Sequence, residues 1–283
     1  MKLQKIMLDG GFTCPNRDGR LGTGGCTFCR TDAFNPSYCR STDSIREQLE
    51  AGKRFFAGKY PNMKYLAYFQ AYSSTYAPLE LLRQRYEEAL SVEDVVGLVI
   101  GTRPDCIADD VLYYLGELQN QGYLISLELG VESFYDRTLQ RVNRGHSAQD
   151  SISAIRRCAQ ADIYTTIHLI LGLPGETKED ILAETDIINR LPINAIKLHQ
   201  LQILKGTPMA KEYAAHPEDF FTMSIDDYVE LAATFISLLR KDIYLERFAA
   251  SAPSELIIAP RWGLKPFEVQ LRIEEKLSSF DSR

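Results

Sequence analysis

The chain has 283 residues, of which 45% are hydrophobic and 25% are charged, so it is neither disordered nor too small to bury a core. Its net charge of −6 excludes a protein that binds nucleic acid over its whole surface, although residues 1–64 hold 11 Lys and Arg against 6 Asp and Glu. No run of about 18 apolar residues is present and the N-terminus lacks a secretory signal, so we expect a cytoplasmic protein without a membrane span.

Apolar runs alternate with amphipathic segments along the chain. Strands are expected at residues 2–8, 64–70, 95–101, 123–130, 163–171 and 194–201. Helices are expected at residues 43–57, 78–90, 109–121, 134–142, 148–161, 176–189 and 208–215. Strands that are each followed by a helix predict parallel βαβ units, and six units fall short of the eight of a closed barrel. We therefore expect an α/β fold, a partial (βα)6 TIM-like barrel over residues 1–206.

The last part of the chain, residues 207–283, has a mainly helical pattern, with further helices expected at 224–240 and 264–278. Residues 244–248 are a candidate for one extra strand. We expect this part to form a C-terminal extension that packs on the barrel. In parallel sheets functional residues gather at the carboxyl ends of the strands, so candidate site residues are sought in the loops that follow them.

The loop after the first strand carries three cysteines in the sequence CPNRDGRLGTGGCTFC, namely Cys14, Cys26 and Cys29. Structural zinc sites and ferredoxin-type clusters take four protein ligands. Three thiolates instead leave one iron of a [4Fe–4S] cubane open for the amino and carboxylate groups of a small molecule. Phe28 adds an apolar surface beside the cysteines. Cys39 could complete a four-cysteine zinc site, so zinc remains an alternative at this point.

Further motifs follow the later strands: YFQAY, IGTRPDCI, LELGVES, VNRGH, HLILGLPGET and KLHQLQILKGTPMA. Together with the cysteine loop they resemble the YhcC/YtqA-like radical S-adenosylmethionine (SAM) family, relatives of the Elongator catalytic subunit and, more distantly, of oxygen-independent coproporphyrinogen oxidase. The resemblance covers nearly all of residues 5–262. Most radical SAM enzymes have three residues between the first two cysteines and this chain has eleven, a long spacing that is typical of the YhcC-like and Elongator-like groups.

The resemblance implies the cofactors and the chemistry. SAM would bind the open iron of the [4Fe–4S] cluster, and a reducing donor such as flavodoxin or ferredoxin would supply one electron. A 5′-deoxyadenosyl radical would then take a hydrogen atom from the substrate. The protein's own share would be to position the reactants and to exclude water and oxygen.

By the same resemblance, a set of residues at the strand ends faces SAM. They are Gln70, Ala71 and Tyr72 in the turn after the second strand, Glu132 after the fourth, Arg144 in NRGH, His168 on the fifth strand and Gly172 in GLPGET. Relatives usually carry a Gly-Gly-Glu-like turn where this chain has QAY, so backbone carbonyls would meet the SAM amino group. Each position also has a plain structural explanation, such as a helix cap for Glu132 or a packed core histidine for His168.

On the substrate side, Lys197 and His199 share one face of the sixth strand, and Gln202 and Lys205 follow. A lysine on an inward strand is costly unless it meets an anion or an acceptor, so we expect Lys197, His199 and Lys205 to act on the substrate. Arg103 is a weaker candidate, and Arg247 is a further cation in an otherwise apolar stretch.

The closest resemblance implies work on the wobble uridine of tRNA, in which a 5-carboxymethylaminomethyl group becomes 5-aminomethyl. The anticodon region would be the partner, with a base stacked on Tyr72 or Tyr76 and the substrate carboxylate on Lys197, Lys205 or Arg247. Two alternatives remain open. One is an oxidase of a tetrapyrrole or another small metabolite, like coproporphyrinogen oxidase, and the other is a non-enzymatic iron–sulfur or zinc module used for sensing.

Overall fold

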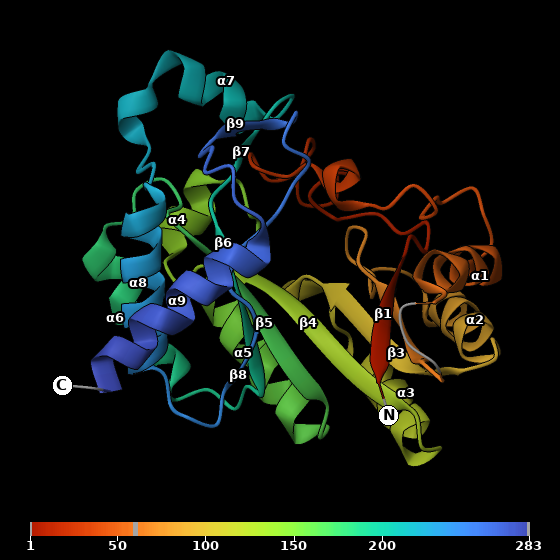
Figure 1. Ribbon diagram of the computed structural model, residues 1–283. Helices are drawn as coiled ribbons and strands as arrows, with labels where there is room; N and C mark the ends of the chain where they lie inside the picture. Colours follow the sequence, from red (N-terminus) through yellow and green to blue (C-terminus); the bar gives the residue numbers. More distant parts are fainter. Residues whose placement is uncertain (1, 59–61, 282–283) are drawn as a thin grey trace.

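The computed structural model describes residues 2–58 and 62–281, in which parallel strands form one curled sheet with helices on its outer face (Figure 1). The sheet has seven strands in the order β1-β2-β3-β4-β5-β6-β8. They are β1 (Leu3–Leu8), β2 (Lys64–Phe69), β3 (Val95–Thr102), β4 (Leu124–Glu132), β5 (Tyr164–Leu171), β6 (Ala195–Gln200) and β8 (Tyr244–Arg247). This half-barrel confirms the predicted partial TIM-like fold, and the candidate strand at 244–248 supplies the seventh strand.

The helices lie close to their predicted ranges. They are α1 (Ile45–Phe56), α2 (Leu79–Leu90), α3 (Asp109–Asn120), α4 (Asp136–Arg141), α5 (Ala148–Gln160), α6 (Lys178–Ile188), α7 (Pro208–Ala215), α8 (Ile225–Leu238) and α9 (Pro266–Asp281). In the C-terminal part, α8 packs beside α6 and α9 packs on α8 (Figure 1). Within the described residues, no helix has the length and apolar character needed to cross a membrane.

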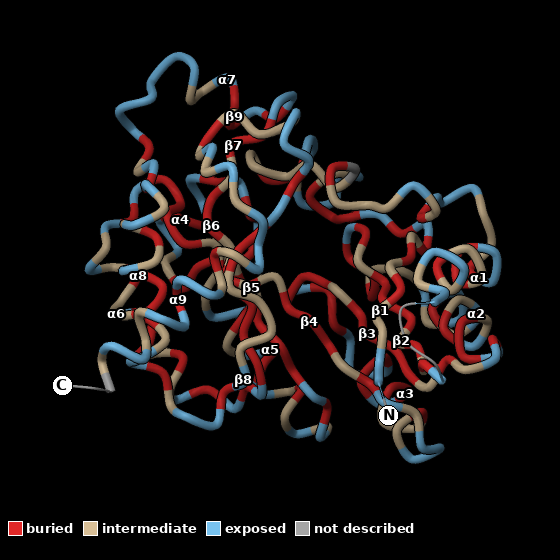
Figure 2. Tube along the Cα trace, viewed as in Figure 1, coloured by how far each residue is buried: buried red, intermediate tan, exposed pale blue. Residues whose placement is uncertain are grey.

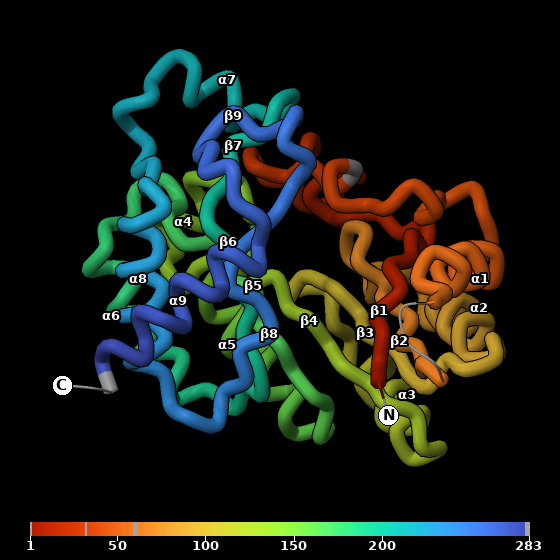
Figure 3. Tube along the Cα trace, in the orientation of Figure 1, coloured from red at the N-terminus to blue at the C-terminus, as the bar shows by residue number. Residues whose placement is uncertain are grey.

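A small antiparallel pair of strands, β7 (Ile203–Leu204) and β9 (Ile257–Ala259), was not predicted. Strands of two and three residues are too short to show a period-2 pattern. Figure 3 shows the loop that carries the cysteines running from β1 across the top of the sheet toward this pair. The backbone N–H of Met209 donates to the Thr27 carbonyl at 3.0 Å, which ties this loop to α7.

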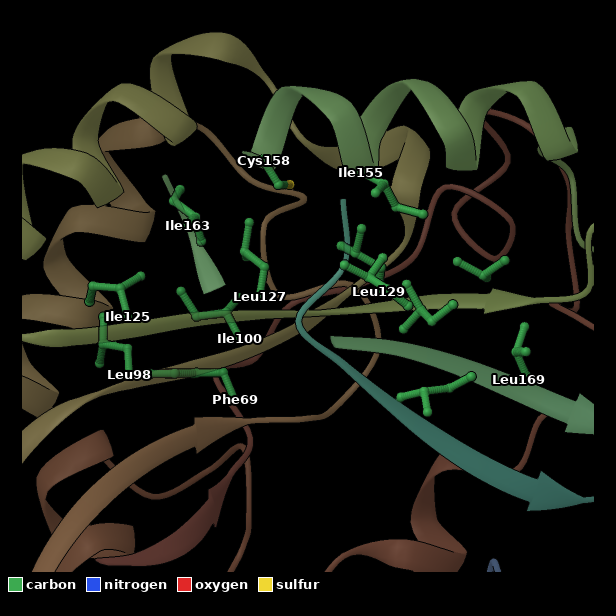
Figure 4. Packing of buried hydrophobic residues seen from close by; sticks show 14 of the residues in the cluster. Phe69, Leu98, Ile100, Ile125, Leu127, Leu129, Ile155, Cys158, Ile163 and Leu169 are labelled. Carbon is green, nitrogen blue, oxygen red and sulfur yellow. The ribbon is translucent and has the colours of Figure 1, made fainter. Parts of the chain in front are cut away.

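The outward side chains of the strands form the main core. Leu127 and Leu129 of β4 and Leu169 of β5 point toward Ile155 and Cys158 of α5 (Figure 4). Figure 2 shows the consequence along the chain, with buried strands beneath helices whose outer turns are exposed. Successive side chains of a strand point to opposite faces, so the apolar set on this face leaves the other set to line the inside of the half-barrel.

The inward set is polar. In the sheet register Glu128 of β4 pairs with Thr166 of β5, and in the next row His168 pairs with Lys197 of β6, which pairs with Arg247 of β8. Residues paired in register point to the same face of the sheet. The fold therefore gathers charged side chains from distant parts of the chain inside the half-barrel.

A β-bulge at the edge strand β8 brings two consecutive residues to the inside. Ile196 pairs with Leu245 and Lys197 pairs with Arg247, which leaves Glu246 as an extra residue. Glu246 then reaches Lys5 on β1, the opposite edge of the sheet, with Nζ and Oε2 2.7 Å apart. This ion pair joins the two edges that an open barrel would otherwise leave apart.

Two buried carboxyl groups hold the loops that follow β4 and β5. The hydroxyl of Ser133 lies 2.5 Å from Oε1 of Glu176 and 3.1 Å from Oε1 of Glu184, which also accepts from the backbone N–H of Phe134 at 2.6 Å. Burial raises the pKa of Glu176 to about 7. Burial, and then the charge of Glu176, raises the pKa of Glu184 to about 8. Near neutral pH Glu184 is therefore largely protonated, and Glu176 is close to its pKa.

We expect Glu184→Gln to change how stability depends on pH. Since the pKa of Glu184 is raised from 4.5 to about 8, folding takes up protons in this range, and the stability that this group contributes at low pH is lost as the pH rises. Glutamine keeps an acceptor for Phe134 and cannot ionise. Urea unfolding from about pH 5 to pH 8 should show the wild type losing stability relative to the variant. A pH-independent difference, or the same behaviour in the exposed control Glu275→Gln, would contradict this explanation.

Candidate functional site

One large pocket opens at the carboxyl ends of the strands, beneath the loop that carries the cysteines. Of the residues singled out in the sequence, those that line it are Cys14, Cys26, Phe28, Cys29, Gln70, Tyr72, Arg103, Glu132, Arg144, His168, His199, Gln202 and Arg247. Ala71, Tyr76, Gly172, Lys197 and Lys205 do not line it. The pocket thus brings together most of the residues that the sequence motifs indicated, from loops far apart in the chain.

Two buried arginines lie against two of the cysteines. Nη1 of Arg103 is 4.0 Å from Sγ of Cys14, and Nη1 of Arg144 is 3.5 Å from Sγ of Cys26. Asp105 fixes Arg103 through two hydrogen bonds of 2.9 Å. A guanidinium offsets the negative charge of a thiolate, the form in which cysteine binds a metal. The sequence analysis gave Arg103 only a weak substrate role, and the structure places it beside a cysteine instead.

Cys39 lies apart from this group and does not line the pocket. Burial, and then the charge of Asp9, raises the pKa of the Cys39 thiol to about 12, so it remains a neutral thiol. Among the described residues, no three His, Cys, Asp or Glu side chains lie close enough together to hold a single metal ion. Each thiolate of a cubane binds a different iron, so the ligands of a cluster do not converge on one point as those of a zinc ion do.

The candidate SAM residues at the ends of β2 and β4 have unusual backbones. Tyr72 has φ +59° and Glu132 has φ +69°, both in the left-handed region that residues other than glycine rarely adopt. Oε1 of Glu132 lies 3.5 Å from Nη2 of Arg144. Strained backbone of this kind concentrates at functional sites. Gly172 also has a positive φ of +91°, and a Cβ there would lie 2.9 Å from Met223, so packing explains this glycine.

Several buried polar atoms of the pocket lack a hydrogen-bond partner within the part of the chain that the structure describes. They are Oε1 of Gln70, Oγ of Ser73, Nε of Arg144, Nε2 of His199 and Oε1 of Gln202. Buried polar groups are nearly always paired in folded proteins. Their concentration in this pocket fits a polar molecule that binds here beside the cysteines.

At the floor of the pocket, Glu128 is the centre of a buried polar network. Its carboxylate lies 2.5 Å from Nζ of Lys197, 2.8 Å from Nζ of Lys5, 2.5 Å from the hydroxyl of Tyr68 and 3.0 Å from Nε2 of His168. Burial by itself would raise the pKa of Glu128, but the hydrogen bond of His168 and the charge of Lys197 hold it well below the usual range. Glu128 is therefore an anion that accepts hydrogen bonds from four donors.

The three residues expected to act on the substrate have different surroundings. Lys197 has a side chain only 4% exposed and lies 3.6 Å from Glu246 as well as against Glu128, so it belongs to the network below the pocket. Lys205 is exposed, and its carbonyl accepts a hydrogen bond from Arg30. His199 does line the pocket, with its ring stacked 5.3 Å from that of His168.

Glu128 was not among the residues predicted from the sequence. Its signal was a lone carboxylate in the apolar run LISLELGV, where a buried acid requires a partner. Asp105 was also not predicted to lie beside the cysteines, whereas Gln202, which was expected on the substrate side, does line the pocket.

Comparison with known proteins agrees with the motifs. Residues 17–186 match the family model of the radical SAM superfamily, and residues 193–279 match that of the radical SAM C-terminal domain. YtqA of Bacillus subtilis is 37% identical over 278 residues, which cover 98% of this chain and 85% of YtqA. YhcC of Escherichia coli is 40% identical over 261 residues, which cover 92% of this chain and 82% of YhcC.

Two more distant similarities involve one archaeon, Methanocaldococcus infernus. The structure of its N-terminally truncated Elp3 has a TM-score of 0.74 at 17% identity, and the match covers 100% of this chain and 63% of that chain. Its tRNA uridine(34) acetyltransferase is 23% identical over 184 residues, which cover 61% of this chain and 33% of that protein. The first similarity shows a shared fold.

The Glu128 network gives a prediction for stability. We expect Glu128→Gln to destabilise the cluster-free protein by about 3–5 kcal/mol, because it removes the nearer carboxylate of the buried Lys197 and leaves Glu246 at 3.6 Å. The double variant Glu128→Gln/Lys197→Met should recover much of this loss, since both charges are gone. Urea unfolding measures both.

As a control, Asp227→Asn breaks the ion pair of Lys178 and Asp227, whose side chains are 42% and 47% exposed, and should cost less than about 1 kcal/mol. Equal losses in the single and double Glu128 variants would show that Lys197 does not depend on Glu128.

Proposed function

This chain belongs to the radical SAM superfamily, and we propose from that premise that Cys14, Cys26 and Cys29 hold a [4Fe–4S] cluster in the pocket. Members of the superfamily are enzymes that use such a cluster together with SAM. When bound, the two cofactors supply a 5′-deoxyadenosyl radical that removes a hydrogen atom from the substrate. The arginines beside Cys14 and Cys26 support this assignment, and so does the position of Cys39 outside the pocket.

The SAM molecule would occupy the pocket next to the cysteines. The unpartnered Nε–H of Arg144 suits its carboxylate, and the unpartnered Oε1 of Gln70 suits its ammonium group. The carboxylate of Glu132 can accept from ribose hydroxyls. Since His168 uses Nε2 toward Glu128, its Nδ1 is the atom left for the ribose. Ala71 and Gly172, which do not line the pocket, would contribute through the backbone alone.

The substrate that we propose is a tRNA wobble uridine with a 5-carboxymethylaminomethyl group. The observation that carries this proposal is the pocket mouth, where Arg17 lies over the ring of Tyr72 at 5.6 Å. A second pair of the same kind, Arg20 over the ring of Tyr76 at 5.8 Å, lies outside the pocket lining. Tyr72 is 41% exposed and lines the pocket, so a base could stack there while the arginines meet phosphates. The similarity to a tRNA uridine(34) acetyltransferase supports the same class of substrate.

The proposed conversion balances in atoms and electrons. A hydrogen atom leaves the carbon between the amine and the carboxylate, and the resulting carbon radical then loses one electron and one proton to become an imine. Addition of water to the imine breaks the carbon–nitrogen bond, and the electron released replaces the priming electron. Overall, one SAM and one water are consumed. The products are 5′-deoxyadenosine, methionine, the 5-aminomethyl nucleoside, glyoxylate and a proton. We also propose that a flavodoxin or ferredoxin supplies the priming electron, which the overall reaction does not consume.

The cluster assignment predicts different effects for two buried cysteines. Anaerobically reconstituted wild type should hold about four irons and four sulfides. Cys26→Ala should lose most of this iron, whereas Cys39→Ala should keep it, because Cys39 lies outside the pocket. Iron and sulfide analysis with absorption spectra checks this. Loss of the cluster in Cys39→Ala would mean that Cys39 is a fourth ligand, and a four-cysteine zinc site would again be an alternative.

The substrate assignment predicts the wobble nucleosides of a deletion strain. Its tRNA should accumulate the carboxymethylaminomethyl form and lose the forms derived from aminomethyluridine, as measured by nucleoside mass spectrometry. A wild-type gene should reverse this and Cys26→Ala should not. With purified enzyme, dithionite and that tRNA, glyoxylate should appear in step with 5′-deoxyadenosine. Unchanged wobble nucleosides would contradict the hypothesis of a tRNA substrate and favour a small-metabolite substrate.

A further inference from the structure

Arg247, at the carboxyl end of β8, is a cation in the pocket that lacks an anionic partner. It lines the pocket, and its side chain makes no ion pair or hydrogen bond within residues 2–58 and 62–281. The two arginines near the cysteines do have carboxylates, Asp105 for Arg103 and Glu132 for Arg144. A partly buried guanidinium without a counter-charge is costly, so this position calls for an anion from outside the chain.

The acidic groups nearby cannot supply that anion. Glu246, the preceding residue, lies 2.7 Å from Lys5 and 3.6 Å from Lys197. Glu128 contacts the same two lysines, at 2.8 and 2.5 Å. Two carboxylates and two ammonium groups therefore balance each other below the pocket, and Arg247 adds a positive charge that they do not offset.

Two neutral polar groups lie on the same side of the pocket. Lys197 is the register partner of Arg247, and His199 follows on the same face of β6 one step nearer the pocket mouth, with Gln202 just beyond the strand. Nε2 of His199 and Oε1 of Gln202 are buried and lack partners among the described residues. Burial, and then the charges of His168 and Arg247, hold the pKa of His199 well below its usual range, so the ring is neutral.

We propose that Arg247, Gln202 and His199 form a subsite for an aminocarboxylate arm of the substrate. The guanidinium takes the carboxylate through two parallel hydrogen bonds, and Oε1 of Gln202 or Nε2 of His199 accepts the N–H of the amine. This deepens the proposed function and rests on it, because the carboxymethylaminomethyl group carries an amine and a carboxylate in this order. The 5-aminomethyl product lacks the carboxylate, so the same subsite distinguishes substrate from product.

The test compares two probes that differ in the carboxylate. One anticodon stem–loop carries 5-carboxymethylaminomethyluridine at the wobble position, and the other carries 5-methylaminomethyluridine. Their binding to the full-length, cluster-loaded protein is measured anaerobically by fluorescence anisotropy. The wild type should bind the carboxylate-bearing probe roughly 10- to 100-fold more tightly, the range of a charged hydrogen-bond pair. Arg247→Met should abolish this preference. Arg247→Lys keeps the positive charge but cannot donate two parallel hydrogen bonds, so it should retain part of the preference.

Arg156→Met is the matched control, since Arg156 is an exposed arginine on α5, away from the pocket lining, and this variant should keep the full preference. Iron content and SAM affinity should be unchanged in all three variants. If both Arg247 variants lose iron or SAM affinity, Arg247 is structural and the subsite is overturned.

The remaining outcomes separate the two proposals. A full preference retained in Arg247→Met would overturn the subsite alone. Equal binding of both probes by the wild type would also overturn it, and normal wobble nucleosides in the deletion strain would then overturn the proposed substrate as well.

Discussion

The inside of this half-barrel depends on one buried carboxylate. Glu128 accepts from donors on β1, β2, β5 and β6, through Lys5, Tyr68, His168 and Lys197. An isolated carboxylate at this depth would be protonated or would unfold its surroundings, so its ionisation requires all of these strands to keep their register. Because Lys5 also contacts Glu246 of β8, the same network brings the two edges of the open sheet together.

The network also determines where the pocket can be. The paired charges of the Glu128 network form the floor of the pocket, and the lysines of this floor are not free to bind a ligand. Groups above the floor, among them Arg144, His199 and Gln202, have polar atoms without partners and face the open end. The division between paired charges below and unpaired groups above is what turns the end of the barrel into a binding site.

The sequence predicted the parts of this architecture that have local signals. Hydrophobic periodicity located the helices and the long strands, and cysteine spacing located the loop. From the sequence, Lys197 was assigned to the substrate and Glu128 was overlooked. The two residues are 69 positions apart in the chain, and their pairing depends on the register between strands. The opposite roles of Glu246 and Arg247 follow from a bulge of one residue, which no periodicity reveals.

The long spacing between the first two cysteines has a physical explanation in the same terms. The inserted residues fold back on themselves, with the backbone N–H of Gly25 donating to the carbonyl of Asn16 at 2.8 Å, so that Cys14 and Cys26 lie in one pocket despite the insertion. Gly25 has φ +81°, and a Cβ there would lie 2.8 Å from the Arg17 guanidinium, so this turn requires glycine. The excursion carries Arg17 onto the ring of Tyr72 at the pocket mouth. Because Arg17 lines the pocket, this turn places a cation at the pocket edge, where it supports the proposed contact with a nucleic-acid substrate.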